Sequence, residues 1–279
     1  MFDVRKHLFS SATTKTMNSQ FAIVVGSGLA GLSASSEIIA RGIPVCLLER
    51  SAKPGGNSMK ASSGINGAPT RYQSEVDTSF YADTLKSAGH AVQVRGKERE
   101  TLMGVLTGES KSAIDWLVDD IGVDLSVVAR LGGHSMTRTH RGGGKLPPGA
   151  AIITSLLKTL RDSPLFNIET EATVTKILKS SEGIIYGIRY ENAQGEVKEL
   201  FGPVVFATGG FAGDAFGMLA KYRPDLAGVP STNGPGAGSQ ELFTEVGGQL
   251  LDSKYSRMRP HPIPTMFCYK NSFRGLLCS

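Results

Sequence analysis

The feature that most constrains the fold is a glycine pattern set between an apolar run and a helical stretch. Phe21-Ala-Ile-Val-Val25 has the composition of a strand buried on both faces, and Gly26-Ser-Gly-Leu-Ala-Gly31 follows it directly. The helical stretch, roughly Leu29 to Arg41, ends at Gly42, and Val45-Cys-Leu-Leu-Glu49 is a second apolar run. Two buried strands joined by one helix predict a β-α-β unit with parallel strands and a right-handed crossover.

The spacing of the three glycines is that of a dinucleotide-binding loop. Gly26 allows the tight turn, Gly28 lets the backbone approach a pyrophosphate, and Gly31 brings helix and strand close together. Glu49 ends the next strand, where a carboxylate accepts hydrogen bonds from ribose hydroxyls and repels a 2′-phosphate. The predicted dinucleotide contacts are Gly26, Ser27, Gly28, Leu29, Ala30, Gly31, Glu49 and Arg50.

The residues after Glu49 favour FAD over a nicotinamide cofactor. Ser51 to Ser58 and Lys60 to Asn66 form a long stretch rich in Gly, Ser and Asn, which suits wrapping an extended ligand with backbone N–H groups and small hydroxyls. A nicotinamide-binding domain would normally proceed to its next helix at this point. The sequence therefore indicates an FAD site.

The rest of the chain alternates between helical and strand periodicity. Residues 74–122 and about 151–160 have helical spacing, and a polar Gly-rich loop over 132–149 lies between them. From Phe166 to Phe206 the apolar period becomes two, which predicts antiparallel strands at 168–178, 184–190 and 196–201, followed by a buried strand at 203–206. The predicted fold class is α/β, an FAD-binding Rossmann-like parallel sheet with inserted helices and an antiparallel β-meander.

The domain organisation follows from the same patterns. Residues 1–20 predict a disordered leader or a targeting segment, 21–258 one FAD-binding domain without a linker, and 259–279 a divergent tail. No apolar stretch is long enough to span a membrane.

Composition excludes several other classes of protein. The three cysteines and five histidines show neither a disulfide framework nor zinc spacing, so we expect no metal site. The net charge of +5 comes from scattered basic residues without interleaved aromatics, so we expect no nucleic-acid partner.

Several segments, in order along the chain, closely resemble the soluble FAD-dependent fumarate reductases. This family includes eukaryotic NADH-dependent enzymes and the flavin domain of flavocytochrome c. The resemblance is nearly continuous from about Phe21 to Asp252. It is carried by the Gly26–Gly31 loop and by Gly55–Gly67, Leu131–Arg141, Gly144–Gly149, Ala207–Phe211 and Thr232–Pro235.

The resemblance implies further FAD contacts. The ribityl chain and flavin edge would be lined by Asn57, Ser58, Ala61, Ser62, Ser63 and Gly64. Val174 would present its backbone to the adenine, near Thr208, Gly209 and Gly210.

The resemblance also implies an oxidoreductase that reduces fumarate to succinate. The electron donor would be NADH or reduced flavin, and the compartment the cytoplasm or the mitochondrion. The alternatives are a related flavoenzyme with another substrate, such as an amino-acid oxidase or a ketosteroid dehydrogenase, and a non-catalytic FAD-binding fragment.

Three basic residues are candidates for binding a substrate carboxylate: Arg138, Arg141 and His261. The alternative for Arg138 and Arg141 is a charged loop that packs on neighbouring carbonyls. After Asn233 the sequence lacks an aspartate with which the family helps to hold the flavin, and past His261 the family pattern stops. No residue is identified as the proton donor. We therefore expect an incomplete or remnant gene product that is inactive by itself.

Overall fold

The computed structural model describes residues 21–89 and 96–250. The predicted leader, the tail and His261 lie outside these residues. Contacts divide the described residues into two compact units, 21–57 with 157–250, and 58–89 with 96–156. The FAD-binding domain over 21–258 that the sequence predicts stays a prediction.

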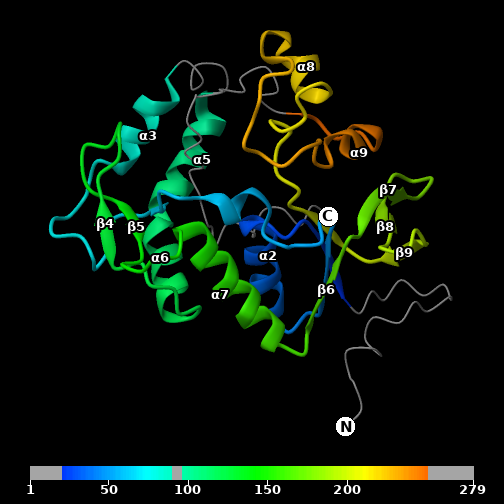
Figure 1. The fold of residues 1–279 in the computed structure, drawn as a ribbon, viewed down its shortest axis with the longest axis horizontal. Helices are drawn as coiled ribbons and strands as arrows, with labels where there is room; N and C mark the ends of the chain where they lie inside the picture. Colours follow the sequence, from blue (N-terminus) through cyan, green and yellow to red (C-terminus); the bar gives the residue numbers. More distant parts are fainter. Residues whose placement is uncertain (1–20, 90–95, 251–279) are drawn as a thin grey trace. The chain divides into compact units, whose positions relative to one another are not determined.

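The first unit is built on a parallel sheet with the strand order β10-β1-β2-β6, whose outer strand β6 is labelled in Figure 1. Its strands are β1 (Ala22–Val25), β2 (Val45–Glu49), β6 (Phe166–Thr170) and β10 (Val204–Phe206). β1 and β2 are buried along their whole lengths. The helix α2 (Leu29–Ile39) packs on both of them, so the predicted β-α-β unit and the α/β class are confirmed.

The segment predicted as one antiparallel strand over 168–178 is two strands in two sheets. β6 runs parallel to β2, while β7 (Thr173–Lys179) pairs antiparallel with β8 (Ile185–Glu191). The chain turns between them at Glu171, whose φ is +56°, and the Ala172 N–H donates to the carbonyl of Glu49 at 2.9 Å. The prediction of a single antiparallel strand was wrong because this turn interrupts the alternation.

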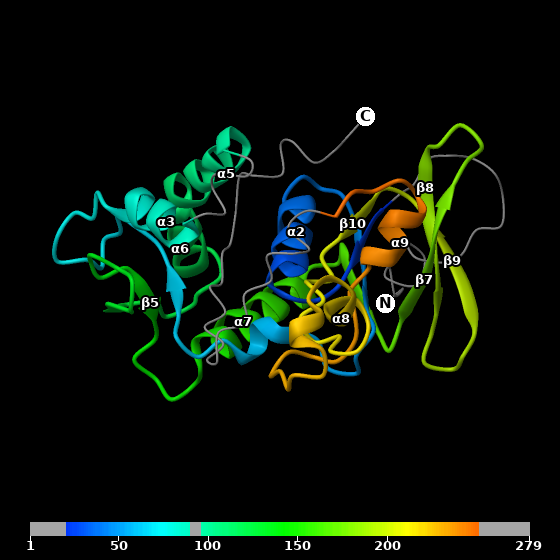
Figure 2. The same ribbon diagram turned by 90° about the horizontal axis from the view of Figure 1, so that it is seen from above.

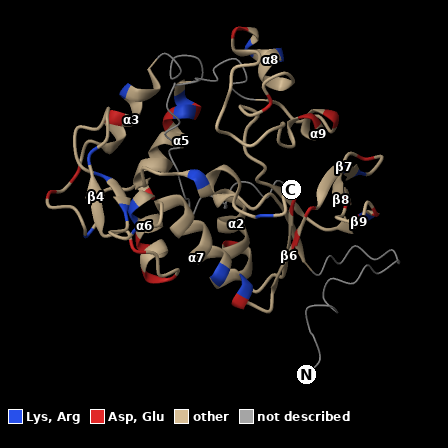
Figure 3. Cartoon of the chain, viewed as in Figure 1, with Lys and Arg blue, Asp and Glu red and all other residues tan. Residues whose placement is uncertain are grey.

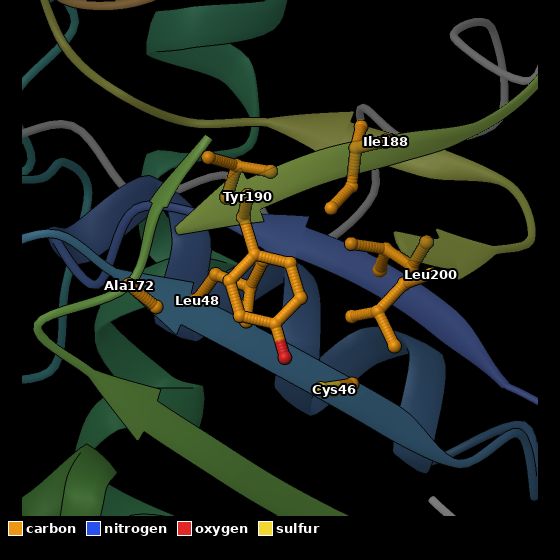
Figure 4. Packing of buried hydrophobic residues seen from close by; sticks show 8 residues of the cluster. Cys46, Leu48, Ala172, Ile188, Tyr190 and Leu200 are labelled. Atoms are coloured by element: carbon orange, nitrogen blue, oxygen red, sulfur yellow. The ribbon is translucent and has the colours of Figure 1, made fainter. Parts of the chain in front are cut away.

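The meander of β7, β8 and β9 (Val197–Phe201) forms a separate sheet that packs on the parallel one (Figure 2). Tyr190 and Ile188 of β8 and Leu200 of β9 face Cys46 and Leu48 of β2 (Figure 4). These side chains are all at most 8% exposed and form one apolar cluster. Burying them removes apolar surface from water, which is the main favourable contribution to the unit's stability.

The second unit combines helices with a small antiparallel sheet. Its strands lie in the order β3 (Ile65–Asn66), β5 (Thr139–Arg141) and β4 (Val127–Ala129). Its helices are α3 (Phe80–Ala88), α5 (Gly96–Gly108) and α6 (Ser110–Asp119). The boundaries between the units fall within η1 (Gly56–Lys60) and α7 (Pro148–Asp162).

Three short elements complete the first unit: α8 (Met218–Tyr222), η2 (Pro224–Leu226) and α9 (Gln240–Glu245). Basic and acidic residues are interspersed along the elements of both units (Figure 3). Among the described residues no helix has the length and apolar character needed to cross a membrane.

Candidate functional site

The carboxyl ends of β1, β2 and β10 lie side by side, because the three strands are parallel and β1 is between the other two. Gly26 follows β1, Glu49 ends β2, and Ala207 to Gly210 follow β10. In open parallel sheets, ligands bind at the carboxyl ends of the strands. The topology therefore places three of the segments chosen from the sequence at one location.

The glycine loop after β1 is tightly packed. Gly26 has φ +101°, and a Cβ built there would lie 2.6 Å from the Ala207 carbonyl oxygen. A Cβ at Gly31 would overlap the carbonyl oxygen of Gly26. A side chain at either position would force the loop and the helix away from the strands.

Gly28 is the N-cap of α2, with φ −66° and ψ 179°, and no side chain caps the helix there. No acidic residue occupies the first turn of α2. The amino end of a helix attracts anions through its N–H groups and dipole. This end of α2 thus has the polarity that a pyrophosphate requires.

Glu49 is buried and organises the loop. Its Oε2 accepts a hydrogen bond from the Ser27 N–H at 2.9 Å and another from the Ser27 hydroxyl, and its Oε1 accepts one from the Ser51 N–H at 2.9 Å. A carboxylate has about four lone-pair sites, so acceptor capacity remains on Oε1 for a ribose hydroxyl. The glycine loop and Glu49 together fit the adenosine and pyrophosphate portion of FAD.

The segment after β10 is tied to the start of α9. The hydroxyl of Thr208 lies 2.7 Å from that of Ser239 and accepts a bond from the Ser239 N–H at 2.9 Å. The Gln240 side-chain amide donates to the Gly209 carbonyl at 2.8 Å. Gly209 and Gly210 are exposed, which leaves their backbone accessible at the carboxyl end of β10.

Arg50 and Asn57 both bond the loop that precedes α9. The Arg50 guanidinium donates to the carbonyls of Ala237 at 2.7 Å and Pro235 at 3.1 Å. Asn57 Oδ1 accepts a bond from the Gly234 N–H at 2.9 Å. These two side chains contact the protein's own loop, and their predicted contact with the cofactor stays a prediction.

Val174 is half-buried in β7, paired with Tyr190 of β8, and packs against the apolar cluster of the first unit. The register of β7 shifts between Val174 and Lys176. This irregularity interrupts the ladder beside Val174, whose backbone was predicted to face the adenine.

The remaining predicted flavin contacts lie in the second unit, in and after η1. Ala61 is fully buried, its N–H donates to the Ser58 carbonyl at 3.2 Å, and its carbonyl accepts a bond from the Gly149 N–H at 2.9 Å. Ser62 is exposed and Ser63 half-buried. Gly64, with φ +133°, lies so close to β5 that a Cβ there would collide with the His140 carbonyl oxygen.

Arg138, one of the predicted carboxylate-binding residues, is buried and paired within the protein. Its side chain is 0% exposed, and its Nε and Nη2 donate to Asp77 at 2.6 and 3.2 Å, while Nη1 donates to Asp83 at 2.6 Å. The guanidinium also lies 4.9 Å from the centre of the Phe80 ring. All three nitrogens are thus engaged within the protein.

His140 is also fully buried, with Nε2 2.7 Å from the Thr70 hydroxyl and Nδ1 2.9 Å from the Arg138 carbonyl. Burial lowers the pKa of this imidazole, which keeps the ring neutral. Arg141, the next residue of β5, is half-buried, so it is the more accessible of the two predicted arginines. Its substrate contact stays a prediction.

Sequence reasoning did not find the roles of Asp77 and Asp83. Hydrogen bonds from Ser135, followed by those from Arg138, hold the pKa of Asp83 well below its usual value. Asp77 precedes Arg138 by 61 residues, and no local spacing signals that pairing. Within the described parts of the chain, no cluster of three or more His, Cys, Asp or Glu side chains is arranged to hold a metal ion.

Comparisons with known proteins show which family the chain resembles. The family model for the FAD binding domain matches residues 22–262. Fumarate reductase 1 of Saccharomyces cerevisiae is 40% identical over 253 residues, which are 85% of this chain and 52% of that protein. The NADH:fumarate oxidoreductase of Klebsiella pneumoniae is 33% identical over 91% of this chain and 27% of that protein.

Among solved structures, the open conformation of a flavocytochrome c3 fumarate reductase superposes with a TM-score of 0.74 at 27% identity. The match covers 82% of this chain and 40% of that one. This chain therefore spans about half the length of the yeast relative and less of the two larger proteins.

Proposed function

Because this chain belongs to the FAD binding domain family and has FAD as its cofactor, we propose that the glycine loop and Glu49 hold the adenosine and pyrophosphate of FAD. The observation that carries this proposal is the junction of β1, β2 and β10, where Gly26 is packed against Ala207 and Glu49 is bonded to Ser27. The proposal also includes the other FAD contacts named from the sequence. It includes the assignment of residues 21–258 to FAD binding as well.

The activity proposed for the whole protein is fumarate reduction to succinate. FAD held by the glycine loop and Glu49 would, once reduced, supply hydride chemistry for one alkene carbon, and an acid would supply the proton for the other carbon. The identity of the yeast relative, 40% over most of this chain, supports this reaction. NADH is proposed as the electron donor because the Klebsiella pneumoniae relative is named for it.

The chain's own part in this reaction is to bind and orient the cofactor. Arg141 is the described residue proposed to attract the dicarboxylate, together with His261. No residue here is assigned as the proton donor. The predicted cytoplasmic or mitochondrial location stays a prediction.

Equilibrium dialysis tests the cofactor site. The purified chain should retain FAD non-covalently, and Glu49→Ala should weaken binding by roughly 1–3 kcal/mol, the cost of losing hydrogen bonds to a charged group. Glu241→Ala removes an exposed carboxylate of α9 and should change nothing. A folded wild-type chain that takes up no FAD would overturn the proposal.

A second experiment tests the reaction. Fumarate should reoxidise dithionite-reduced FAD bound to the chain no faster than it reoxidises free reduced FAD, because no residue of the chain is assigned as the proton donor. A faster rate, with FAD binding verified, would overturn the expectation that this chain is inactive by itself.

A further inference from the structure

The segment proposed to line the flavin edge, Ser62 to Gly64, continues directly into β3. β3 is only two residues long, so its position depends on its pairing with β5: Ile65 with His140 and Asn66 with Thr139. The Thr139 hydroxyl also donates to Asn66 Oδ1 at 2.7 Å. The contacts that fix the position of β5 therefore also fix the position of Ser62 to Gly64.

The close approach at Gly64 strengthens that dependence. A Cβ there would collide with the His140 carbonyl oxygen and lie 2.8 Å from Cγ2 of Thr139. The backbone of Gly64 is thus in direct contact with β5. A small displacement of β5 would move the residues just before Gly64 as well.

The start of β5 is fixed by the backbone and the side chain of Arg138. The Arg138 carbonyl accepts a bond from the Gly67 N–H at 3.0 Å and contacts His140 Nδ1 at 2.9 Å. The side chain meets Asp77 through two nitrogens and Asp83 through a third. A bidentate guanidinium–carboxylate pair fixes orientation as well as distance.

The charges of this cluster do not favour a substrate dicarboxylate. Two carboxylates, those of Asp77 and Asp83, face the single guanidinium of Arg138, which is 0% exposed. The cluster has no excess positive charge, and a second pair of carboxylates would be repelled. Burial and the two carboxylate partners leave the guanidinium with a supporting role.

We propose that Arg138, held by Asp77 and Asp83, is a positioning residue that sets the flavin-edge segment Ser62–Gly64 through β5 and β3. This inference rests on the proposed function, because that function assigns Ser62–Gly64 to the flavin. A site residue is productive only when the residues that support it are themselves locked by packing and hydrogen bonds.

The test compares Arg138→Lys, Asp77→Asn and Arg71→Met with the wild-type chain. Arg138→Lys keeps the charge and loses the bidentate geometry, while Asp77→Asn alters the other side of the same pair. Arg71→Met removes the exposed Arg71–Asp119 ion pair of the same unit and is the matched control. The measurements are the FAD dissociation constant and the visible circular dichroism of bound FAD, at a temperature where far-ultraviolet dichroism shows an intact fold.

Both Arg138→Lys and Asp77→Asn should weaken FAD binding by about tenfold and alter the visible dichroism of the flavin in the same way. Arg71→Met should leave both unchanged. A purely structural role would change the unfolding midpoint without changing the dichroism of bound FAD. Asp77→Asn is the milder variant and serves if Arg138→Lys does not fold.

Two results overturn the inference. One is flavin dichroism and FAD affinity that stay at wild-type values in both variants. The other is a succinate-induced change in the flavin spectrum that is lost in Arg138→Lys but kept in Asp77→Asn, as expected of a substrate ligand. Failure of the wild-type chain to bind FAD would instead contradict the proposed function, so the two failures are distinguishable.

Discussion

Two hydrogen bonds from Ser27, one from its backbone N–H and one from its hydroxyl, end on the same oxygen of Glu49. The Ser27 hydroxyl also accepts a bond from the Gly55 N–H at 2.9 Å. One side chain therefore joins the glycine loop, the end of β2 and the loop that follows it. The hydroxyl is fully buried, so each of these bonds is shielded from water.

Ser27→Ala should lower the free energy of unfolding by about 1–3 kcal/mol, because it leaves the buried Gly55 N–H without its acceptor. FAD affinity should fall as well, since Glu49 loses one of the bonds that orient it. Urea unfolding and dialysis against FAD measure the two effects. Ser35→Ala is the control, because it removes only a bond to the Gly31 carbonyl within α2. If Ser27→Ala and Ser35→Ala lowered the free energy of unfolding and the FAD affinity equally, the role of Ser27 in joining these segments would be contradicted.

Gly31→Ala should destabilise the first unit strongly, because the new Cβ collides with the Gly26 carbonyl oxygen and neither backbone segment can yield cheaply. The expected loss exceeds about 2 kcal/mol, in the upper part of the usual range for overpacking. Gly104→Ala in α5 meets no atom within 4 Å and should be neutral or stabilising by up to about 1 kcal/mol. Thermal unfolding followed by circular dichroism compares them. A Gly31→Ala protein with wild-type stability would show that the contact is not tight.

His140 should make stability depend on pH. Burial, the largest influence, lowers the pKa of its imidazole in the folded chain, although contacts with the Arg138 and Ile65 backbone oppose this in part. The unfolded chain binds the proton more readily, near pH 6.5, so the stabilisation is present above that pH and is lost as the pH falls below it. The urea concentration at the midpoint of unfolding, measured at several pH values between 7.5 and 5, gives the slope of stability against pH.

His140→Gln removes the titrating group and should flatten that slope. His134, whose pKa is also lowered by burial and then by Arg138, is the other histidine that titrates nearby, so His134→Gln is measured alongside. The remaining groups in contact with the His140 ring are the Thr70 hydroxyl and the Tyr72 ring, which do not titrate in this range. An unchanged slope in His140→Gln would refute the assignment.

Tyr190→Phe should destabilise the packing of the meander on the parallel sheet. The Tyr190 hydroxyl donates to Glu169 Oε2 of β6 at 2.8 Å, and the ring lies in the apolar cluster that Figure 4 shows. Losing one hydrogen bond to a charged acceptor costs about 1.5–3 kcal/mol. Tyr186→Phe, which keeps the ring stacked on Phe201, should cost less in the same urea titration. The reverse order would contradict the importance of the bond to Glu169.

Local patterns predicted the elements that the site depends on most. The run ending at Val25, the glycine loop and the strand ending at Glu49 are recognisable because their periodicity and glycine spacing are properties of neighbouring residues. The split at Glu171 was missed because its turn depends on where β2 and β8 lie. The strands β3 and β5 have two and three residues, too few to show a period.

The carboxylate partners of Arg138 were missed for a similar reason. When only its neighbours in the Gly-rich loop are considered, a basic residue is a candidate for ligand binding. Its partners Asp77 and Asp83 precede it by 61 and 55 residues, so only the folded chain shows that the charge is neutralised.

The strand order β10-β1-β2-β6 also constrains how the protein is made. β1 is an inner strand, yet its partner β10 is synthesised only after residues 58–156 of the second unit, since Val25 pairs with Phe206. At about 5–20 residues per second, a ribosome needs on the order of ten seconds or more to deliver that partner. During this interval one edge of β1 has no partner strand, and such edges promote aggregation. We therefore expect newly made chains to require a chaperone at this stage, and to become independent of it once β10 has emerged.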